Sequence, residues 1–464
     1  MDKYKLTVGL EVHAELSTET KMFCACKNDG NEKRPNWNIC PICMGHPGTL
    51  PVPNREAIKN VLKVGVAIGG ELSSKTEFDR KNYFYPDIPK GYQISQFKYP
   101  FVVGGELAGI KITRVHLEED TARSSHENGV SLVDFNRAGV PLMELVTEPV
   151  IHSGEEVVRF GRELQLLLQY LGVSEANMEK GEMRVEANIS VSDSDKLGTK
   201  VEVKNLNSFR AANDAVNFEY RRHVEILENG GKISQETRGW DENSKSTFSQ
   251  RSKEDSHDYR YFPDPDLAKI DLELIPEFNR DVLKKELALT PEAKRARFAQ
   301  DYNIKKEDIE FFILNRDLSN LFERAAEGLE GGQFQLLSNY VVSDLASFGD
   351  AALSLNPMHL AQLINMIDHD QVSSRGAKNI LNIMLNSPDA PDLIAEREGL
   401  FQKNDTGALM EIIEQIIKDN PLVVTEYKNG KVSALQYLVG QGMKLSKGSA
   451  NPGVLKSMLE KAIS

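Results

Sequence analysis

The sequence predicts an α+β protein in which an N-terminal region built on an antiparallel sheet is followed by helical domains. Apolar and polar residues alternate strictly over residues 6–15, which is the pattern of a strand with one buried face. A second alternating segment, 182–191, is joined by a polar turn to a third at 200–204, and this arrangement predicts an antiparallel pair. From residue 291 to the C-terminus the pattern is almost entirely helical.

Two helices are predicted within the N-terminal region. The first follows Ser153-Gly154-Glu155-Glu156, which has the form of a capping box, and its apolar residues then form one helical stripe as far as Leu171. The second is expected over 211–227 and ends at Gly230-Gly231.

The composition changes at Thr290-Pro291, which resembles an N-cap followed by a first-turn proline. We therefore expect three domains, namely a sheet-containing domain over 1–290, a helical domain over 291–352 and a helical tail domain over 353–464.

The chain has 464 residues and a net charge of −13, so it lacks a chain-wide basic field for nucleic acid. No window approaches the ~18 apolar residues that a membrane span needs. The N-terminus lacks the apolar core of a signal peptide, and we expect a cytoplasmic protein without membrane partners. The segment 421–464 has six lysines and two acidic residues, a balance that suits phosphate contacts or a solvated helix face.

The four cysteines form two close pairs, Cys24 with Cys26 and Cys40 with Cys43. This spacing predicts a structural zinc site with four thiolate ligands in an insertion over 24–43. Disulfides are the alternative, and a cytoplasmic location disfavours them. Four protein ligands close the coordination sphere, so this zinc is not expected to take part in chemistry.

Carboxylates and a histidine are expected on the polar face of the first strand, where Glu11, His13 and Glu15 alternate with apolar residues. Such a row can hold a hard cation or move a proton, or it can simply be solvated. A second acidic group lies at 116–120. Glu144 interrupts an apolar run, so we expect it to be buried with either a metal ion or an arginine such as Arg137 as its partner.

Two further polar segments allow alternative interpretations. The predicted pair 182–191 and 200–204 has a charged face of mixed sign, which suits either cross-strand ion pairs or a nucleotide-binding surface. The segment 78–96 is interpreted as a loop in which Arg80, Lys81 and Lys90 line a polar channel, contact phosphate, or are solvated. The sequence has no Walker A motif, so any ATP site is not a P-loop.

Several long motifs resemble one known family. These are Gly9-Leu10-Glu11-Val12-His13, the segments 80–96, 116–120, 203–209 and 258–267, residues 136–137 with 141–144, and residues 442–444 with 446–448. On these residues the sequence resembles the B subunits of tRNA-dependent glutamyl/aspartyl-tRNA amidotransferases, the GatB family.

The resemblance implies a heterotrimeric enzyme that uses ATP and Mg²⁺. An amidase subunit releases ammonia from glutamine or asparagine, and a small third subunit stabilises the other two. The GatB-type chain phosphorylates the side-chain carboxylate of misacylated Glu-tRNA(Gln) or Asp-tRNA(Asn), and ammonia then displaces phosphate. In the family the catalytic domain resembles the glutamine synthetase fold, and the helical domains engage tRNA.

The resemblance also implies roles for particular residues. Glu11, His13, Glu119 and Glu144 are expected to form the catalytic magnesium site, and Lys81 and Lys90 are expected to line the ammonia route. Glu119 lies on the apolar side of the alternation, so the strand is expected to end or bulge before it.

The sheet-face argument adds Arg184, Asn188, Lys204 and Asn205 as candidate phosphate and ATP contacts. Lys444 and Lys447 in the basic tail are candidate tRNA contacts. Two other functional classes compete with this assignment. One is a tRNA-binding scaffold with a structural cation, which carboxylates within apolar strands argue against. The other is a free-standing ligase of the glutamine synthetase kind, which the long helical C-terminus argues against.

Overall fold

The structure, a computed structural model, describes residues 3–252, 259–402, 406–446 and 450–463. These residues form two compact units, one up to Pro291 and one from Glu292 onward. The first contains the main sheet and the second is helical, which confirms the predicted α+β class and the order of its parts. Within the described ranges, no helix has both the length and the apolar character needed to cross a bilayer.

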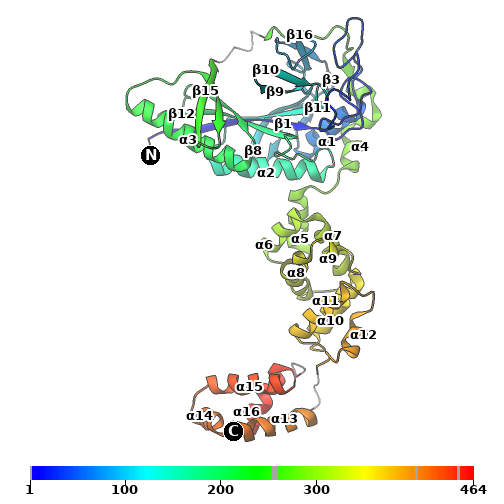
Figure 1. Ribbon diagram of the computed structural model, residues 1–464, viewed down its shortest axis with the longest axis vertical. Helices are drawn as coiled ribbons and strands as arrows, with labels where there is room; N and C mark the ends of the chain where they lie inside the picture. The colour runs from blue at the N-terminus through cyan, green and yellow to red at the C-terminus, as the bar shows by residue number, and fades with distance from the viewer. Residues whose placement is uncertain (1–2, 253–258, 403–405, 447–449, 464) are drawn as a thin grey trace. The chain divides into compact units, whose positions relative to one another are not determined.

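The main sheet of the described residues has the strand order β15-β14-β13-β12-β1-β11-β8-β6-β2, with β7 paired to β8 (Figure 1). Every neighbouring pair is antiparallel except β13 with β14. The strands are β1 (Lys5–Glu15), β2 (Glu71–Leu72), β6 (Val102–Val103), β7 (Glu106–Leu107), β8 (Ile110–Glu119), β11 (Pro141–Thr147), β12 (Met183–Ser192), β13 (Val201–Leu206), β14 (Glu236–Asp241) and β15 (Ser246–Ser252).

The first predicted strand is the central strand of this sheet. It pairs with β12 on one side and with β11 on the other, and its residues Val8, Leu10, Val12 and Ala14 are buried. The antiparallel pairing predicted between 182–191 and 200–204 is also present, as β12 with β13. Because side chains alternate along a strand, the opposite face of β1 presents its polar residues.

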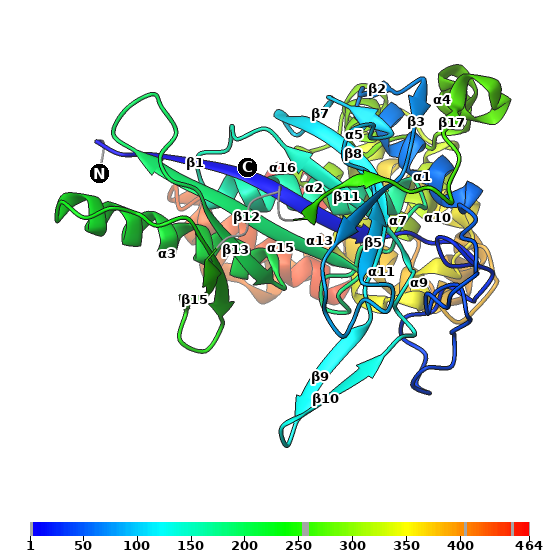
Figure 2. The ribbon, with the colours of Figure 1, turned by 90° about the horizontal axis from the view of Figure 1, so that it is seen from above.

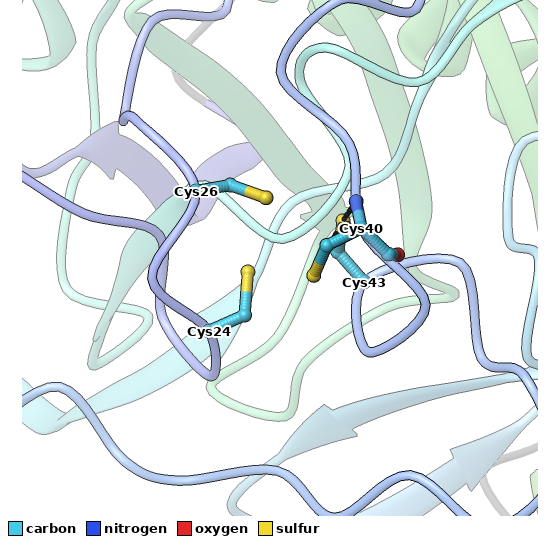
Figure 3. Close-up of side chains that lie close together, drawn as sticks. All are labelled: Cys24, Cys26, Cys40 and Cys43. Carbon is cyan, nitrogen blue, oxygen red and sulfur yellow. Dashed lines mark hydrogen bonds between the residues drawn. The ribbon is translucent and has the colours of Figure 1, made fainter.

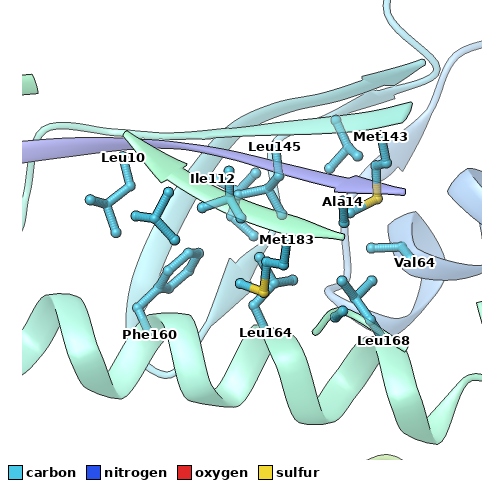
Figure 4. Packing of buried hydrophobic residues seen from close by; sticks show 14 of the residues in the cluster. Leu10, Ala14, Val64, Ile112, Met143, Leu145, Phe160, Leu164, Leu168 and Met183 are labelled. Atoms are coloured by element: carbon cyan, nitrogen blue, oxygen red, sulfur yellow. The ribbon is translucent and has the colours of Figure 1, made fainter. Parts of the chain in front are cut away.

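The apolar face packs against helices α1 (Arg55–Ala67), α2 (Gly154–Tyr170) and α3 (Phe209–Glu228). Phe160, Leu164 and Leu168 of α2 point toward the strands (Figure 4). The N-cap of the expected capping box is present, since the Ser153 hydroxyl accepts the Glu156 N–H, while the Glu156 carboxylate accepts the N–H of His152. The helix expected over 211–227 begins at Phe209 because Ser208 caps it.

Among the described residues of the first unit, three small sheets accompany the main sheet. The strands β4 (Asp79–Asn82), β5 (Tyr92–Ser95) and β16 (Phe262–Pro263) form one, β9 (Arg123–Glu127) and β10 (Val130–Asp134) form a projecting hairpin (Figure 2), and β3 (Lys75–Thr76) pairs with β17 (Ile270–Asp271). The interpretation of the segment 78–96 as a loop is wrong at both of its ends. Strand β4 begins at Asp79 and β5 ends at Ser95, and the two strands pair with each other. Arg80 lies on β4 and bonds Asp264, 2.8 Å away across the β4–β16 pairing.

The remaining helices follow the main sheet in the chain. The last helix of the first unit is α4 (Arg280–Glu286), and short 3₁₀ turns occur at Leu272–Leu274, Pro276–Phe278 and Leu345–Phe348. The second unit contains α5 (Pro291–Asp301), α6 (Lys306–Leu314), α7 (Arg316–Ala326), α8 (Gln333–Ser343), α9 (Asp350–Leu353), α10 (Pro357–Asp368), α11 (Ser374–Met384), α12 (Pro391–Arg397), α13 (Thr406–Asp419), α14 (Pro421–Lys428), α15 (Ser433–Leu445) and α16 (Pro452–Ile463).

The second unit is held by apolar contacts between its helices. Phe298, Phe312 and Phe322 pack ring against ring among α5, α6 and α7. Helices α13, α15 and α16 share a separate buried cluster that includes Ile413 and Leu455. The helical pattern predicted from residue 291 onward is confirmed.

Candidate functional site

The polar face of the main sheet gathers titratable side chains from the five adjacent strands β13, β12, β1, β11 and β8. In the register, His13 of β1 lies opposite Glu144 of β11, and Glu144 lies opposite His116 of β8. On the other side of β1, Glu11 lies opposite Glu186 of β12. These residues therefore share one face because the pairing brings positions of the same parity together.

The first group, which we call the histidine–carboxylate cluster, consists of His13, His116, Glu118 and Glu144. The Glu144 carboxylate lies 3.3 Å from Nε2 of both histidines, and Glu118 lies 3.7 Å from Nε2 of His13. Candidate ligand atoms of His13, Glu118 and Glu144 lie within 4.8 Å of one another. All four side chains are largely buried, with His13 the most exposed at 15%.

The charges of His13 and Glu144 stabilise each other. Burial opposes the charge on His13, yet its hydrogen bond to Glu144 and the nearby carboxylates raise its pKa to about 9. Burial likewise opposes the charge on Glu144, but the two histidines hold its pKa well below the usual range. Without a metal ion, His13 is therefore protonated at neutral pH and offsets the negative charge of the carboxylates. A divalent cation bound at the same carboxylates would take over this role, and His13 would then lose its proton.

The second group, which we call the three-carboxylate cluster, consists of Glu11, Glu186 and Glu202. Their candidate ligand atoms also lie within 4.8 Å of one another. Lys204 contacts Glu186 at 2.7 Å and Glu202 at 3.9 Å, and Asn188 donates to Glu11 at 2.9 Å. Three carboxylates against one ammonium leave net negative charge at a partly buried position, which favours a divalent cation.

The four residues expected to form one magnesium site occupy three places. His13 and Glu144 lie in the histidine–carboxylate cluster, and Glu11 lies in the three-carboxylate cluster. Glu119 belongs to neither. Its expected strand break is absent, because β8 pairs in unbroken register with β11 from Val115 through Glu119. Glu118, not Glu119, lies beside His13 and Glu144. Strict alternation along the strand from His116 predicts this, because residues two apart point to the same face.

Glu119 instead pairs with Lys90. Its carboxylate lies 2.6 Å from Lys90 Nζ and accepts the Ile94 backbone N–H at 2.9 Å. The other lysine expected on the ammonia route, Lys81, is 5.1 Å from the Tyr259 ring centroid. Burial opposes the charge on Lys81, but Tyr261, Glu118 and Glu144 raise its pKa, so the ammonium stays charged beside the first cluster.

Three of the four candidate phosphate-binding residues contact carboxylates of the same unit. Arg184 bonds Asp120 at 2.8 Å, and the donors of Asn188 and Lys204 contact carboxylates as described above. Asn205 is exposed and has a left-handed backbone (φ 64°) next to a register shift between β12 and β13. Their contacts with phosphate stay a prediction.

Of the two candidate tRNA contacts, Lys444 is exposed near the end of α15. Lys447 lies outside the described residues, as does Asp258 in the motif at 258–267. The role of these tail lysines therefore also stays a prediction.

The four cysteines converge from two segments that are separate in sequence (Figure 3). All four are free thiols, and their sulfur atoms lie within 4.8 Å of one another. Tetrahedral thiolate ligation of zinc requires S–S separations of about 3.8 Å, and Cys40 Sγ lies 3.9 Å from Cys43 Sγ. The donor set and spacing therefore fit a metal ion.

The protonation of this cysteine group fits metal binding as well. The thiol of Cys24 donates to Cys43 and, despite burial, lowers the pKa of Cys43 to about 5, with further help from the Lys21 ammonium. Burial raises the pKa of Cys26 to about 12. Without a metal Cys43 is therefore a thiolate at neutral pH, and binding of zinc would release the protons of Cys24 and Cys26.

Comparison with known proteins identifies the class to which this architecture belongs. Residues 6–275 match the family model of the GatB/GatE catalytic domain, and residues 330–463 match that of the GatB domain. The two matches span the sheet-containing unit and most of the helical unit. They define the class as GatB-type proteins, in which a catalytic domain precedes helical domains.

Full-length relatives give the same result. The B subunit of the aspartyl/glutamyl-tRNA(Asn/Gln) amidotransferase from Brevibacillus brevis is 40% identical and aligns with 100% of this chain and 99% of its own length. The proteins of the same name from Carboxydothermus hydrogenoformans (40%) and Chlorobium chlorochromatii (41%) align with 99% of this chain and with 98% and 99% of their own. The chain belongs to the GatB family, the B subunits of these amidotransferases. The family and the enzyme class predicted from the sequence are confirmed.

Proposed function

We propose that this chain phosphorylates the side-chain carboxylate of misacylated Glu-tRNA(Gln) or Asp-tRNA(Asn) with ATP, and then supports amidation by ammonia. The observation that carries this proposal is the pair of ligand clusters on one face of a continuous sheet, both anchored on β1. One strand supplies Glu11 to one cluster and His13 to the other. The two clusters extend from β1 toward opposite neighbouring strands, so they could hold two separate cations.

Phosphorylation of a carboxylate by ATP requires a site that binds divalent cations. A carboxylate is a poor acyl donor, so an oxygen of the substrate carboxylate attacks the γ-phosphorus of ATP, forming an acyl phosphate and releasing ADP. Ammonia then attacks the acyl carbon, phosphate leaves, and the nitrogen loses a proton. Magnesium at the two clusters would neutralise phosphate charge and align the attack. In this chain, Glu11, Glu118 and Glu144 would hold the cations, while Lys204 and Asn188 orient the carboxylates of the second cluster.

The wider assembly follows from family membership. We propose that the chain acts in a cytoplasmic heterotrimer, together with its amidase partner and a small third subunit. Ammonia would pass Lys81 and Lys90, whose ammonium groups contact aromatic rings and Glu119. The helical domains at 291–352 and 353–464 would contact tRNA, with exposed Lys444 as one contact, and zinc at the cysteines would have a structural role.

The test is ATP turnover by the chain reconstituted with the amidase and the small third subunit. Turnover is measured with Glu-tRNA(Gln), with Asp-tRNA(Asn) and with neither, in the presence of Mg²⁺. Turnover that depends on a misacylated tRNA is the expected result, and the better tRNA names the substrate. Dependence on neither would reject the kinase role and favour a tRNA-binding scaffold.

Two variants connect this activity to the described residues. Glu144→Gln removes a charge from the centre of the histidine–carboxylate cluster, so we expect turnover to fall at least about 100-fold. Glu127→Gln, on the exposed β9 strand, is the matched control and should leave turnover unchanged. Equal activity of the two variants would contradict the placement of the reaction at this cluster.

A further inference from the structure

The cysteine group lies directly against the Lys90–Glu119 pair. The second cysteine pair is part of a tight turn in which the Cys40 carbonyl accepts the Met44 N–H and Cys43 Sγ accepts the Cys40 N–H. We call residues 40–45 the cysteine turn. It ends at Gly45, whose backbone is left-handed with φ +66°.

Gly45 is the point of contact between the cysteine turn and Lys90. A Cβ atom built on Gly45 would lie 2.4 Å from Lys90 Cγ, 3.2 Å from its Cβ and 3.1 Å from its Cα. A rotamer change of Lys90 would move Cγ away, but the tight contacts with its Cα and Cβ would remain, so an added Cβ displaces the base of Lys90 in either case. The main chain of Gly45 therefore supports the base of the Lys90 side chain.

The other end of Lys90 is held as well. Its ammonium lies 2.6 Å from the Glu119 carboxylate, which is itself fixed by the Ile94 backbone N–H. The side chain of Lys90 is only 10% exposed and that of Glu119 only 3%. Lys90 is thus held between the cysteine turn at its base and the end of β8 at its tip.

A small cavity joins the two groups. It has a volume of about 60 Å³ and is lined by both thiol and charged side chains, among them Cys24, Cys43, His46, Lys90 and Glu119. A polar cavity of this size accommodates water molecules. Movement of the cysteines therefore changes the wall of the space in which Lys90 lies.

We propose that metal binding by the four cysteines positions Lys90 for ammonia delivery, through the contact between Gly45 and the base of Lys90. The metal fixes the cysteine turn, the turn holds Lys90 against Glu119, and this pair keeps the ammonia route aligned. Gly45 is then a positioning residue. The inference rests on the proposed function. It predicts different effects on two activities: ammonia derived from glutamine passes Lys90, whereas the ATP-dependent step takes place at the histidine–carboxylate and three-carboxylate clusters.

The test compares Gly45→Ala with Gly48→Ala in the reconstituted complex. Both glycines have left-handed backbones, but a Cβ at Gly48 (φ +83°) meets no atom within 4 Å, so only Gly45→Ala disturbs Lys90. We expect the ratio of glutamine-dependent to ammonium-dependent amidation to fall about tenfold in Gly45→Ala, since small displacements of positioning groups have effects of this size. The ratio should be unchanged in Gly48→Ala, and tRNA-dependent ATP turnover should be unchanged in both.

A second measurement does not depend on activity or on the folding of a variant. Zinc is removed from the wild-type complex with a chelator, Mg²⁺ is restored, and lysine modification by an amine-reactive reagent is followed by mass spectrometry. We expect Lys90 to be modified severalfold faster after metal removal, while the exposed Lys98 keeps its rate. The amidation ratio of the stripped complex should fall as it does in Gly45→Ala.

The outcomes distinguish the inference from the proposed function. An unchanged Lys90 modification rate after zinc removal would overturn the inference, even if the complex is fully active. An unchanged amidation ratio in both Gly45→Ala and the stripped complex would overturn it too. Absence of tRNA-dependent ATP turnover in the wild type would instead reject the proposed function, and the modification rates would still decide whether the metal positions Lys90.

Discussion

Replacement of Glu219 by alanine is expected to destabilise the first unit strongly. Glu219 of α3 is fully buried and joins this helix to the β14–β15 edge of the sheet. Its carboxylate lies 2.7 Å from Arg222, 3.1 Å from His223 and 3.3 Å from Arg238, and it accepts a hydrogen bond from Thr247. Removing it leaves the mostly buried Arg222 and Arg238 with Glu236 as a shared carboxylate, and takes away the buried charge that both of them contact.

The magnitude follows from the pKa of Glu219. Burial opposes its charge, but the bonds from His223, Arg222 and Thr247 lower its pKa from 4.5 to about 2. This shift corresponds to about 3 kcal/mol of folding free energy, and loss of one partner from a buried ion pair costs about 3–5 kcal/mol. Because the folded pKa is depressed, the contribution is complete above pH 4.5 and is lost as the pH falls toward 2.

The assay is urea unfolding of the full chain followed by fluorescence of Trp240. Trp240 lies on β14 and is 7% exposed, whereas Trp37, the other tryptophan in the sequence, is 60% exposed. A Trp37→Phe background therefore reports unfolding at the sheet edge that Glu219 supports. The control is Glu225→Ala on the exposed side of α3, which should stay within about 0.5 kcal/mol of the parent.

Two outcomes would refute this reasoning. A loss below about 1 kcal/mol in Glu219→Ala would show that the buried contacts contribute no more than exposed ones. A difference between parent and variant that grows as the pH falls from 4.5 toward 2 would have the wrong sign for a carboxylate with a depressed pKa.

Three further predictions concern the core, the cation sites and the tail. Phe160→Ala should lower the unfolding free energy by about 3–5 kcal/mol in the same assay, because Phe160 is fully buried between α2 and the sheet; a loss under about 1 kcal/mol would contradict its place in the core. Glu11→Gln should remove one of two Mn²⁺ ions bound per chain in a calorimetric titration and Glu144→Gln should remove the other, whereas unchanged stoichiometry in both would argue against the clusters as cation sites. Lys444→Glu should weaken tRNA binding by the complex and reduce its salt slope by about one unit, and an unaltered slope would exclude this lysine from phosphate contact.

Much of the fold follows from local sequence patterns. The strand at 6–15, the paired strands after residue 182 and the capped helix after Ser153 each bury one face, and this requirement is visible as a period of two or of about 3.6 residues. The pairing of β4 with β5 was missed because Asp79-Arg80-Lys81-Asn82 has no apolar alternation. Its side chains are held by ion pairs and by hydrogen bonds to distant segments, as Arg80 is by Asp264.

The candidate site was predictable only in part. Glu11, His13 and Glu144 stand out because each is a charged or titratable residue within an apolar strand. Glu186 and Glu202 become partners of Glu11 only through the register of three strands, which no single segment encodes. Strict alternation along β8 favours Glu118 over Glu119, and the structure places Glu118 in the cluster.

The position of β1 at the centre of the main sheet has a consequence for how the chain is made. This strand leaves the ribosome well before its neighbours β11 and β12, which lie far later in the chain. At usual rates of translation, β1 waits on the order of ten seconds for them. Throughout this delay both backbone edges of β1 lack the strands that pair with them, and we expect chaperone occupancy on the nascent chain to end once β12 has emerged.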